Sequence, residues 1–222
     1  MILHIFGDSH RIAIFNVAKE LGLQVTEDLG EGYTIARIGT QKLELINIAD
    51  KSKFIVNEGD AVCFAFGEID CRTHLCKPEN FKNYKELIDE IVFRYFEAIK
   101  ANVEQYKNLK TLVNNVVPAV SVIDNPMLID HYGPQTTTLY PFNGTDEERK
   151  LVADYMHVKY KEYCEKYNFI FIDVYDKYCD EKGLLLRYRI EDGKSIQMSD
   201  TTHIWNTIYL KEFFIKNIIP LL

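Results

Sequence analysis

The chain has 222 residues, and its 47% hydrophobic content is enough to bury the core of one α/β domain. A formal net charge of −7 argues against nucleic acid or an anionic membrane surface as the main partner. No apolar run approaches the roughly 20 residues that span a bilayer, and the pattern of a signal peptide is absent. Five cysteines, an odd number, favour free thiols in a reducing compartment, so we expect a cytoplasmic protein.

The first apolar run, Ile2–Phe6, predicts a buried strand that ends in Gly7-Asp8-Ser9. The segment Arg11–Leu21 then predicts a helix, because one face carries apolar residues at helical spacing, namely Ile12, Phe15, Ala18 and Leu21. Ser9 is therefore expected between the carboxyl end of a strand and the amino end of a helix. Open α/β sheets hold their ligands there, and free backbone N–H groups are available to an anion.

Residues 23–59 are less regular. Short alternating runs lie around Tyr33–Ile38 and Leu43–Ile48, on either side of Gly39, and we expect one sheet strand here with an irregular connection. The continuous apolar run Ala61–Phe66 follows a turn signal and is typical of a central parallel strand. It ends in a dense polar cluster, Gly67–His74, again at the carboxyl end of a strand.

The second half of the chain predicts alternating helices and strands. They are a long helix over Pro78–Tyr106, a strand at Leu112–Val117, a helix from Thr145 to about Lys166, a strand at Phe169–Ile172, a possible hairpin within Leu184–Gln197 and a terminal helix over Thr207–Ile219. The irregular stretch 118–144 holds four of the six prolines and is a candidate for a substrate-side loop. This order predicts one three-layer α/β domain over residues 1–222, with about five mostly parallel strands.

A serine is a poor nucleophile until a base takes its proton and a third group orients that base. His203 lies three residues after Asp200, beyond the last predicted strand of the sheet. In a tight turn, that spacing lets the carboxylate reach Nδ1 and leaves Nε2 facing outward. Ser9, His203 and Asp200 therefore have the residue types of a catalytic triad. The D-x-x-H pattern is common by chance and gains weight from its place near the end of a chain that begins with G-D-S.

These residues resemble the SGNH hydrolases, also called the GDSL esterase/lipase superfamily. The first block is Gly7-Asp8-Ser9 and the last is Asp200–His203, while Gly39 and Gly67–Asp70 are looser matches to the second and third blocks. The blocks therefore cover nearly the whole chain. The resemblance implies a flavodoxin-like sandwich with no metal or cofactor. It also implies Ser9 as nucleophile, His203 as base and Asp200 as the orienting acid.

The same resemblance implies an oxyanion hole made by the N–H groups of Ser9 and Gly39 and by a third-block asparagine. Ile69 stands in place of that asparagine and cannot donate a hydrogen bond from its side chain. Loss of one such donor costs about 10²–10³ in turnover. The G-E-I-D-C-R-x-H version of this block resembles a subset of SGNH-like proteins found near glycan-assembly functions. We expect Arg72 or His74 to replace the missing donor.

Structural alternatives remain open for these side chains. Ser9 could be only a helix N-cap, and His203 a packed loop histidine. Glu68 and Asp70 could act as an acid–base pair, although we expect one of them to pair with Arg72 at the floor of the pocket. A zinc site could be formed by Cys71, His74 and Cys76, because their spacing suits this metal. No second Cys/His pair stands nearby, so we expect no metal.

The sequence thus predicts a serine esterase, or a related acyltransferase, acting on a small O-acyl group. Acetyl on a carbohydrate is the substrate that the resemblance implies, and the expected partner is a small-molecule or carbohydrate ester. The rival hypothesis is a catalytically weak or inactive SGNH-like module that binds a glycan or a protein partner. Ile69 is the residue that favours this alternative.

Overall fold

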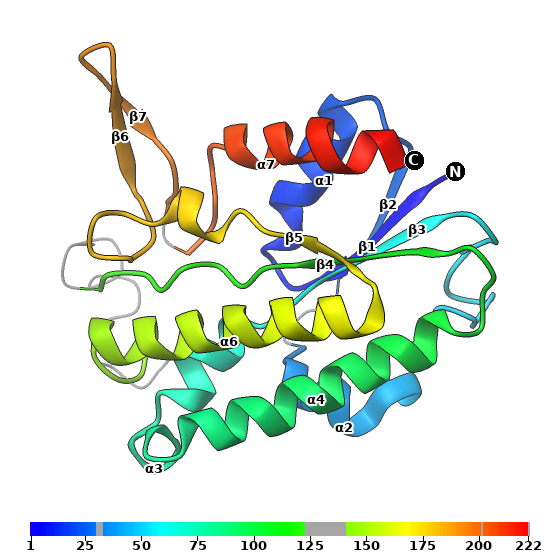
Figure 1. The fold of residues 1–222 in the computed structure, drawn as a ribbon, viewed down its shortest axis with the longest axis horizontal. Coiled ribbons are helices and arrows are strands. Elements are labelled where there is room, and N and C mark those ends of the chain that lie inside the picture. Colours follow the sequence, from blue (N-terminus) through cyan, green and yellow to red (C-terminus); the bar gives the residue numbers. More distant parts are fainter. Residues whose placement is uncertain (30–32, 123–140, 201, 222) are drawn as a thin grey trace.

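A five-stranded parallel sheet forms the centre of the molecule, with the strand order β2-β1-β3-β4-β5 (Figure 1). The computed structural model describes residues 1–29, 33–122, 141–200 and 202–221. The strands are β1 (Leu3–Gly7), β2 (Val25–Leu29), β3 (Ala61–Ala65), β4 (Lys110–Asn114) and β5 (Ile170–Ile172). Every residue of β1 and β3 is buried, as expected for central strands covered on both faces.

Helices cover both faces of the sheet and make three layers (Figure 1). One face carries α1 (Arg11–Glu20) and α7 (Ile208–Phe213), whose apolar side chains share one core cluster. The other face carries α2 (Ile35–Gln41), α4 (Tyr84–Val103) and α6 (Asp146–Tyr167), which form a second core cluster. The predicted three-layer α/β fold with five parallel strands is confirmed.

The strand order places a topological switch point between β1 and β3. The chain leaves β1 toward β2 on one side and then returns to place β3 on the other side. In open α/β sheets of this order, ligands bind outside the carboxyl ends of the strands at that point. Gly7 and Ala65 are paired at the carboxyl ends of β1 and β3, so the segments that follow the two strands begin side by side.

The one sheet strand expected within residues 23–59 is present as β2, and it precedes both alternating runs. The run Tyr33–Ile38 enters α2 instead. Ile35 and Ile38 are three residues apart and both buried, which is helical spacing that a short alternating run imitates. Thr34 begins the helix as its N-cap, since its side chain accepts a hydrogen bond from the Arg37 N–H at 3.2 Å.

Other predicted elements are confirmed with shifted boundaries. The long helix predicted from Pro78 is two helices, the short α3 (Pro78–Phe81) and α4. Thr145 and Glu148 form a reciprocal capping box at the start of α6, with hydrogen bonds of 3.1 and 2.7 Å.

The expected substrate-side stretch 118–144 falls largely outside the described residues. No helix in the described ranges is long and apolar enough to cross a membrane.

The predicted hairpin is formed by β6 (Tyr188–Glu191) and β7 (Lys194–Gln197), which pair antiparallel and stand away from the body of the molecule (Figure 1). Its two turn residues, Asp192 and Gly193, both have positive φ, as a two-residue hairpin turn requires. The hairpin leads directly into the segment that carries Asp200 and His203.

The contact between α2 and α4 depends on Gly39. A Cβ atom there would lie 2.7 Å from the Arg94 Cβ and 3.0 Å from the Tyr95 backbone nitrogen. Real Cβ atoms do not approach their neighbours so closely, so any larger residue would push the two helices apart.

We therefore expect Gly39→Ala to lower the free energy of unfolding by about 1–3 kcal/mol, through overpacking of this contact. Urea denaturation followed by circular dichroism measures the change. Thr40→Ala, at the exposed neighbouring position of the same helix, is the matched control and should stay within about 0.5 kcal/mol of the native protein. Equal stability of Gly39→Ala and the native protein would contradict the close contact.

Candidate active site

The turn after β1 exposes Ser9 between two buried polar residues. Asp8 and His10 are only 2% and 8% exposed. The Asp8 N–H donates to the carbonyl oxygen of Ala65 on β3 at 3.2 Å, and the His10 N–H donates to Asp8 Oδ1 at 2.9 Å. These bonds hold the turn against the sheet on both sides of Ser9, so the serine side chain faces solvent at the switch point.

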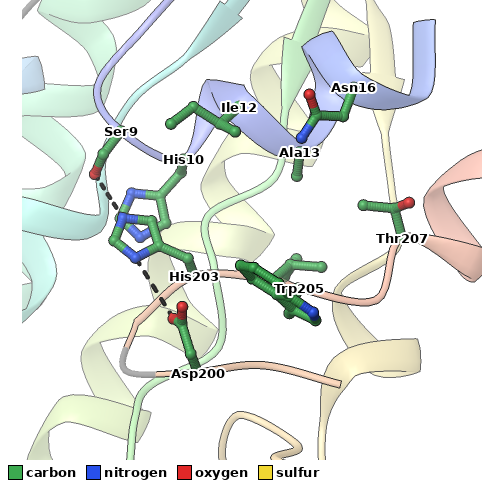
Figure 2. A pocket seen from close by; sticks show the side chains of 10 residues that line it. Ser9, His10, Ile12, Ala13, Asn16, Asp200, His203, Trp205 and Thr207 are labelled. Carbon is green, nitrogen blue, oxygen red and sulfur yellow. Dashed lines mark hydrogen bonds and ion pairs between the residues drawn. The ribbon is translucent and has the colours of Figure 1, made fainter. Parts of the chain in front are cut away.

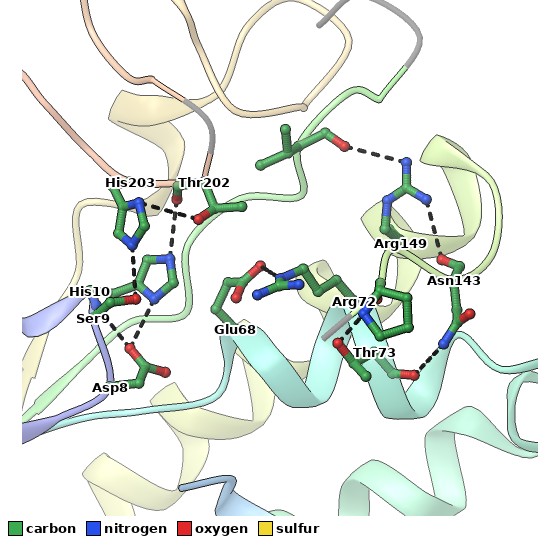
Figure 3. Close-up of polar contacts among 12 residues, drawn as sticks. Asp8, Ser9, His10, Glu68, Arg72, Thr73, Asn143, Arg149, Thr202 and His203 are labelled. Carbon is green, nitrogen blue, oxygen red and sulfur yellow. Dashed lines mark hydrogen bonds and ion pairs between the residues drawn. The ribbon is translucent and has the colours of Figure 1, made fainter. Parts of the chain in front are cut away.

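His10 links this turn to a segment near the other end of the chain. Its Nδ1 donates to Asp8 Oδ1 at 2.8 Å, and its Nε2 donates to the carbonyl oxygen of Thr202 at 3.1 Å (Figure 3). Both ring nitrogens thus face acceptors, an arrangement that an imidazolium ring satisfies. Burial alone would lower the pKa of His10, but the charge and hydrogen bond of Asp8 outweigh burial and raise this pKa above its usual value.

His203 lies directly over His10 and reaches Ser9. Its Nε2 is 2.8 Å from Ser9 Oγ, although the two residues are 194 positions apart in the sequence (Figure 2). The two imidazole rings stack with their centroids 4.7 Å apart and their planes 21° from parallel. Burial, followed by the charge of His10, lowers the pKa of His203 to about 4. His203 is therefore neutral at pH 7 and can accept the hydrogen bond of the Ser9 hydroxyl.

Asp200 lies beside His203 without the close hydrogen bond that its spacing predicted. Its Oδ1 is 3.7 Å from His203 Nδ1, an ion-pair distance, while the Thr202 hydroxyl is at 3.4 Å from the same nitrogen. The Asp200 N–H donates to the His203 carbonyl oxygen at 3.2 Å and closes the turn. The carboxylate thus adds negative charge near the ring, and its charge opposes the lowering of the His203 pKa.

The segment after β3 brings a charged pair to the same region. Arg72 Nε donates to Glu68 Oε1 at 2.6 Å (Figure 3). Its guanidinium lies over the ring of Phe142, 4.8 Å from the centroid. Glu68 is 7% exposed. The charge of Arg72 opposes the rise in the pKa of His10 and adds slightly to the lowering of the pKa of His203.

Asp70, the other acid of this block, has a structural position. It is buried, and its two oxygens accept hydrogen bonds from the N–H groups of Ile35 and Ala36 at 2.8 and 3.4 Å. Burial raises the pKa of Asp70 to about 7, although these backbone hydrogen bonds lower it. Asp70 thus caps the start of α2 and is not paired with Arg72.

Two residues expected as oxyanion-hole donors, Gly39 and His74, and the third-block position Ile69 are not brought to Ser9 by contacts that the structure describes. Gly39 lies inside α2, where its amide belongs to the helical hydrogen-bond ladder, so it is not at the site and its assignment as a donor is corrected. Ile69 is buried and has no side-chain donor. His74 is half-buried on the helical turn Asp70–Leu75, and within the described ranges no contact joins its ring to Ser9 or His203.

Sequence reasoning did not identify the role of His10 or the pocket beside Ser9. A pocket of about 430 Å³ opens between α1 and the segment after His203, lined among others by Ser9, Ile12, Asn16, His203, Trp205 and Thr207 (Figure 2). Ile12 was expected in the core but is 47% exposed here, because the buried face of α1 is formed by Ala13, Ile14, Val17 and Ala18. The described residues contain no cluster of three or more side chains of the kinds that hold a metal.

Compared by sequence, the chain matches no protein-family model and no curated protein. Compared by structure, it is similar to a GDSL-like lipase from Bacteroides thetaiotaomicron, with a TM-score of 0.56 and 13% identity over 100% of this chain and 89% of that one. It is also similar to a carbohydrate acetylesterase from Sinorhizobium meliloti (TM-score 0.54, 13% identity, 100% and 99% covered) and to an acetyl xylan esterase (TM-score 0.54, 15% identity, 99% and 100% covered). At these identities the likeness is one of fold.

The stacked histidines generate a prediction about protonation. NMR titration of the native protein should give His203 a pKa of about 4. In His10→Phe, which keeps an aromatic ring but removes the charge and both side-chain hydrogen bonds of His10, we expect the pKa of His203 to rise. It should remain below the ordinary value of 6.5, because burial is the larger cause and persists.

His157 serves as an internal control in the same spectra, since its ring stacks on Tyr175 instead. A His203 that titrates near 6.5 in the native protein, or whose titration is identical in His10→Phe, would contradict this interpretation of the site.

Proposed function

We propose that this chain, which has the fold of the SGNH hydrolases, is a serine esterase that removes or transfers a small O-acyl group, with acetyl on a carbohydrate as the substrate. The observation that carries the proposal is the 2.8 Å contact between Ser9 Oγ and His203 Nε2 at the carboxyl edge of the sheet. The acetyl xylan esterase and the carbohydrate acetylesterase among its structural neighbours support the substrate class.

In the first step, Ser9 Oγ attacks the acyl carbonyl carbon while His203 Nε2 accepts the hydroxyl proton. A neutral imidazole is required for this transfer, and the lowered pKa of His203 keeps the ring neutral at pH 7. The imidazolium that forms lies 3.7 Å from the Asp200 carboxylate, whose charge stabilises it. The charge of His10 beneath the ring opposes the protonation of His203. Neutral His203 is therefore a weak base in this step, and its imidazolium is a strong acid in the next step.

In the second step, the tetrahedral intermediate collapses and His203 donates its proton to the oxygen of the leaving alcohol. This leaves an acyl group on Ser9 and a neutral ring. Water, or the hydroxyl of an acceptor sugar, then attacks the acyl group while His203 again accepts a proton. His203 then returns this proton to Ser9 Oγ as the acid or the new ester is released, which completes the cycle.

The oxyanion that forms in each step needs hydrogen-bond donors. The backbone N–H of Ser9, at the start of the turn into α1, is one candidate donor. Ile69 supplies none, and we assign the second donor to Arg72, because Glu68 holds its Nε at 2.6 Å and the guanidinium acts electrostatically on both histidines of the site. A guanidinium also stabilises negative charge more strongly than a neutral amide.

We expect Arg72→Ala to lower kcat on p-nitrophenyl acetate by about 10²–10³, the usual effect of losing one oxyanion donor. Arg94→Ala removes an exposed arginine that forms an ion pair with Glu90 on the same helix, and this control should leave kcat unchanged. His74→Ala should also retain native turnover. If both Arg72→Ala and His74→Ala stayed within roughly threefold of the native protein, neither residue would replace the missing asparagine.

A fluorophosphonate probe tests the nucleophile directly. It should modify the native protein stoichiometrically at Ser9 at neutral pH, and His203→Ala should react at least about 10² more slowly, because the serine has lost its base. Ser52→Ala, at an exposed serine elsewhere on the surface, is the control and should react like the native protein.

Absence of labelling at neutral pH would refute the esterase. It would favour the alternative of a catalytically inactive SGNH-like module that binds a glycan or a protein partner, for which the buried, donor-free side chain of Ile69 is the supporting observation.

A further inference from the structure

The pocket beside Ser9 has two distinct walls. One wall is the exposed face of α1, where Ile12 and Asn16 lie one turn apart and point to the same side. The other wall is the segment after His203, which contributes Trp205 and Thr207 (Figure 2). The pocket has a volume of about 430 Å³, which lies in the range of pockets that bind small molecules. This volume is far larger than an acetyl group needs.

Trp205 is the only tryptophan of the chain, and its side chain is not used by the core. The residue is 68% exposed, whereas its backbone N–H is fixed by a hydrogen bond to the Met198 carbonyl oxygen at 2.9 Å. A rigid backbone thus presents a large exposed aromatic ring beside the candidate nucleophile. Across the pocket, Ile12 is 47% exposed and lies outside the buried face of α1. Exposed apolar side chains with polar neighbours are typical of a ligand-binding surface.

Polar groups occur at both ends of the pocket. Ser9 and His203 lie at one end, and Asn16 and Thr207 lie at the other, with Trp205 between them (Figure 2). A long acyl chain would cover the amide of Asn16 and the hydroxyl of Thr207 without replacing their hydrogen bonds to water, which is unfavourable. A sugar ring has C–H groups on its face and hydroxyl groups around its edge, so it matches both the aromatic wall and the polar end.

We propose that this pocket is the subsite for the sugar that carries the acyl group, with a pyranose ring lying against Trp205 and Ile12 and its hydroxyls bonded to Asn16 and Thr207. The position of the acyl group at Ser9 rests on the proposed function. The sugar is thus the leaving alcohol of the first step, and His203, at the same end of the pocket as Ser9, returns the proton to its oxygen.

Binding is measured by the fluorescence of Trp205, since no other tryptophan contributes to the signal. The Ser9→Ala protein is used, because it cannot turn over an ester. It is titrated with the methyl pyranosides of xylose, glucose, galactose, mannose and N-acetylglucosamine, and separately with sodium octanoate. We expect a saturable change in emission with at least one pyranoside and none with octanoate. Saturation by octanoate alone would assign the pocket to an acyl chain, and no change with any probe would overturn the proposal.

Kinetics separate sugar binding from the chemistry at Ser9. Trp205→Ala should raise KM for acetylated xylo-oligosaccharides, or for the acetylated form of whichever pyranoside binds, by about 3- to 10-fold, as for a lost aromatic contact. Trp205→Phe should restore most of the affinity. With ethyl acetate, whose leaving alcohol is too small to cover Trp205, the loss in kcat/KM should be smaller than with the sugar ester. Equal losses on both substrates would indicate a structural role for Trp205 and contradict the subsite.

Tyr188→Ala is the matched control, because Tyr188 is an exposed aromatic residue on the hairpin and does not line the pocket. It should leave both substrates unaffected. The two proposals can fail separately. Saturable pyranoside binding in a protein whose Ser9 is inert to fluorophosphonate would retain the sugar subsite and refute the esterase, whereas labelling of Ser9 without pyranoside binding would do the reverse.

Discussion

The side chain of His10 joins the two ends of the chain, and the geometry of the site depends on that junction. Its ring bonds Asp8 on one side and the carbonyl oxygen of Thr202 on the other, across 192 positions of sequence. Ser9 lies between Asp8 and His10, and His203 follows Thr202 directly. One buried ring therefore sets the separation of Ser9 Oγ and His203 Nε2, while the parallel pairing of β1 with β3 fixes the turn that carries the ring.

The same junction determines the charge around His203. Partial burial and, after it, the charge of His10 beneath the ring keep the pKa of His203 low, whereas Asp200, at 3.7 Å, only partly offsets them. The buried carboxylate of Asp8 compensates the charge of His10, since an unpaired imidazolium could not remain charged at this depth. The result is an imidazole that stays neutral well below pH 7. Arg72, held by Glu68, adds a second positive charge that acts on both histidines.

The sequence predicted the parts of the molecule that follow from local patterns. Buried runs and the residues at their ends identified β1, β3 and the positions of Ser9 and His203, because polar residues after a parallel strand gather at one edge of the sheet. Gly39 was misassigned because a helix-packing glycine and a loop glycine look alike in sequence. The roles of Asp70, His10 and Trp205 depend on contacts with distant segments, which neither periodicity nor residue spacing reveals.

The proposed function makes the protein an esterase whose base, His203, is shielded from protonation. The most direct test is the dependence of kcat/KM on pH for an acetyl ester, because its acid limb reports the pKa of the essential base in the free enzyme. The account predicts an acid limb near pH 4 in the native protein, within the range in which circular dichroism shows it folded, and a limb at higher pH in His10→Phe. An acid limb near pH 6.5 that is the same in both proteins would contradict it.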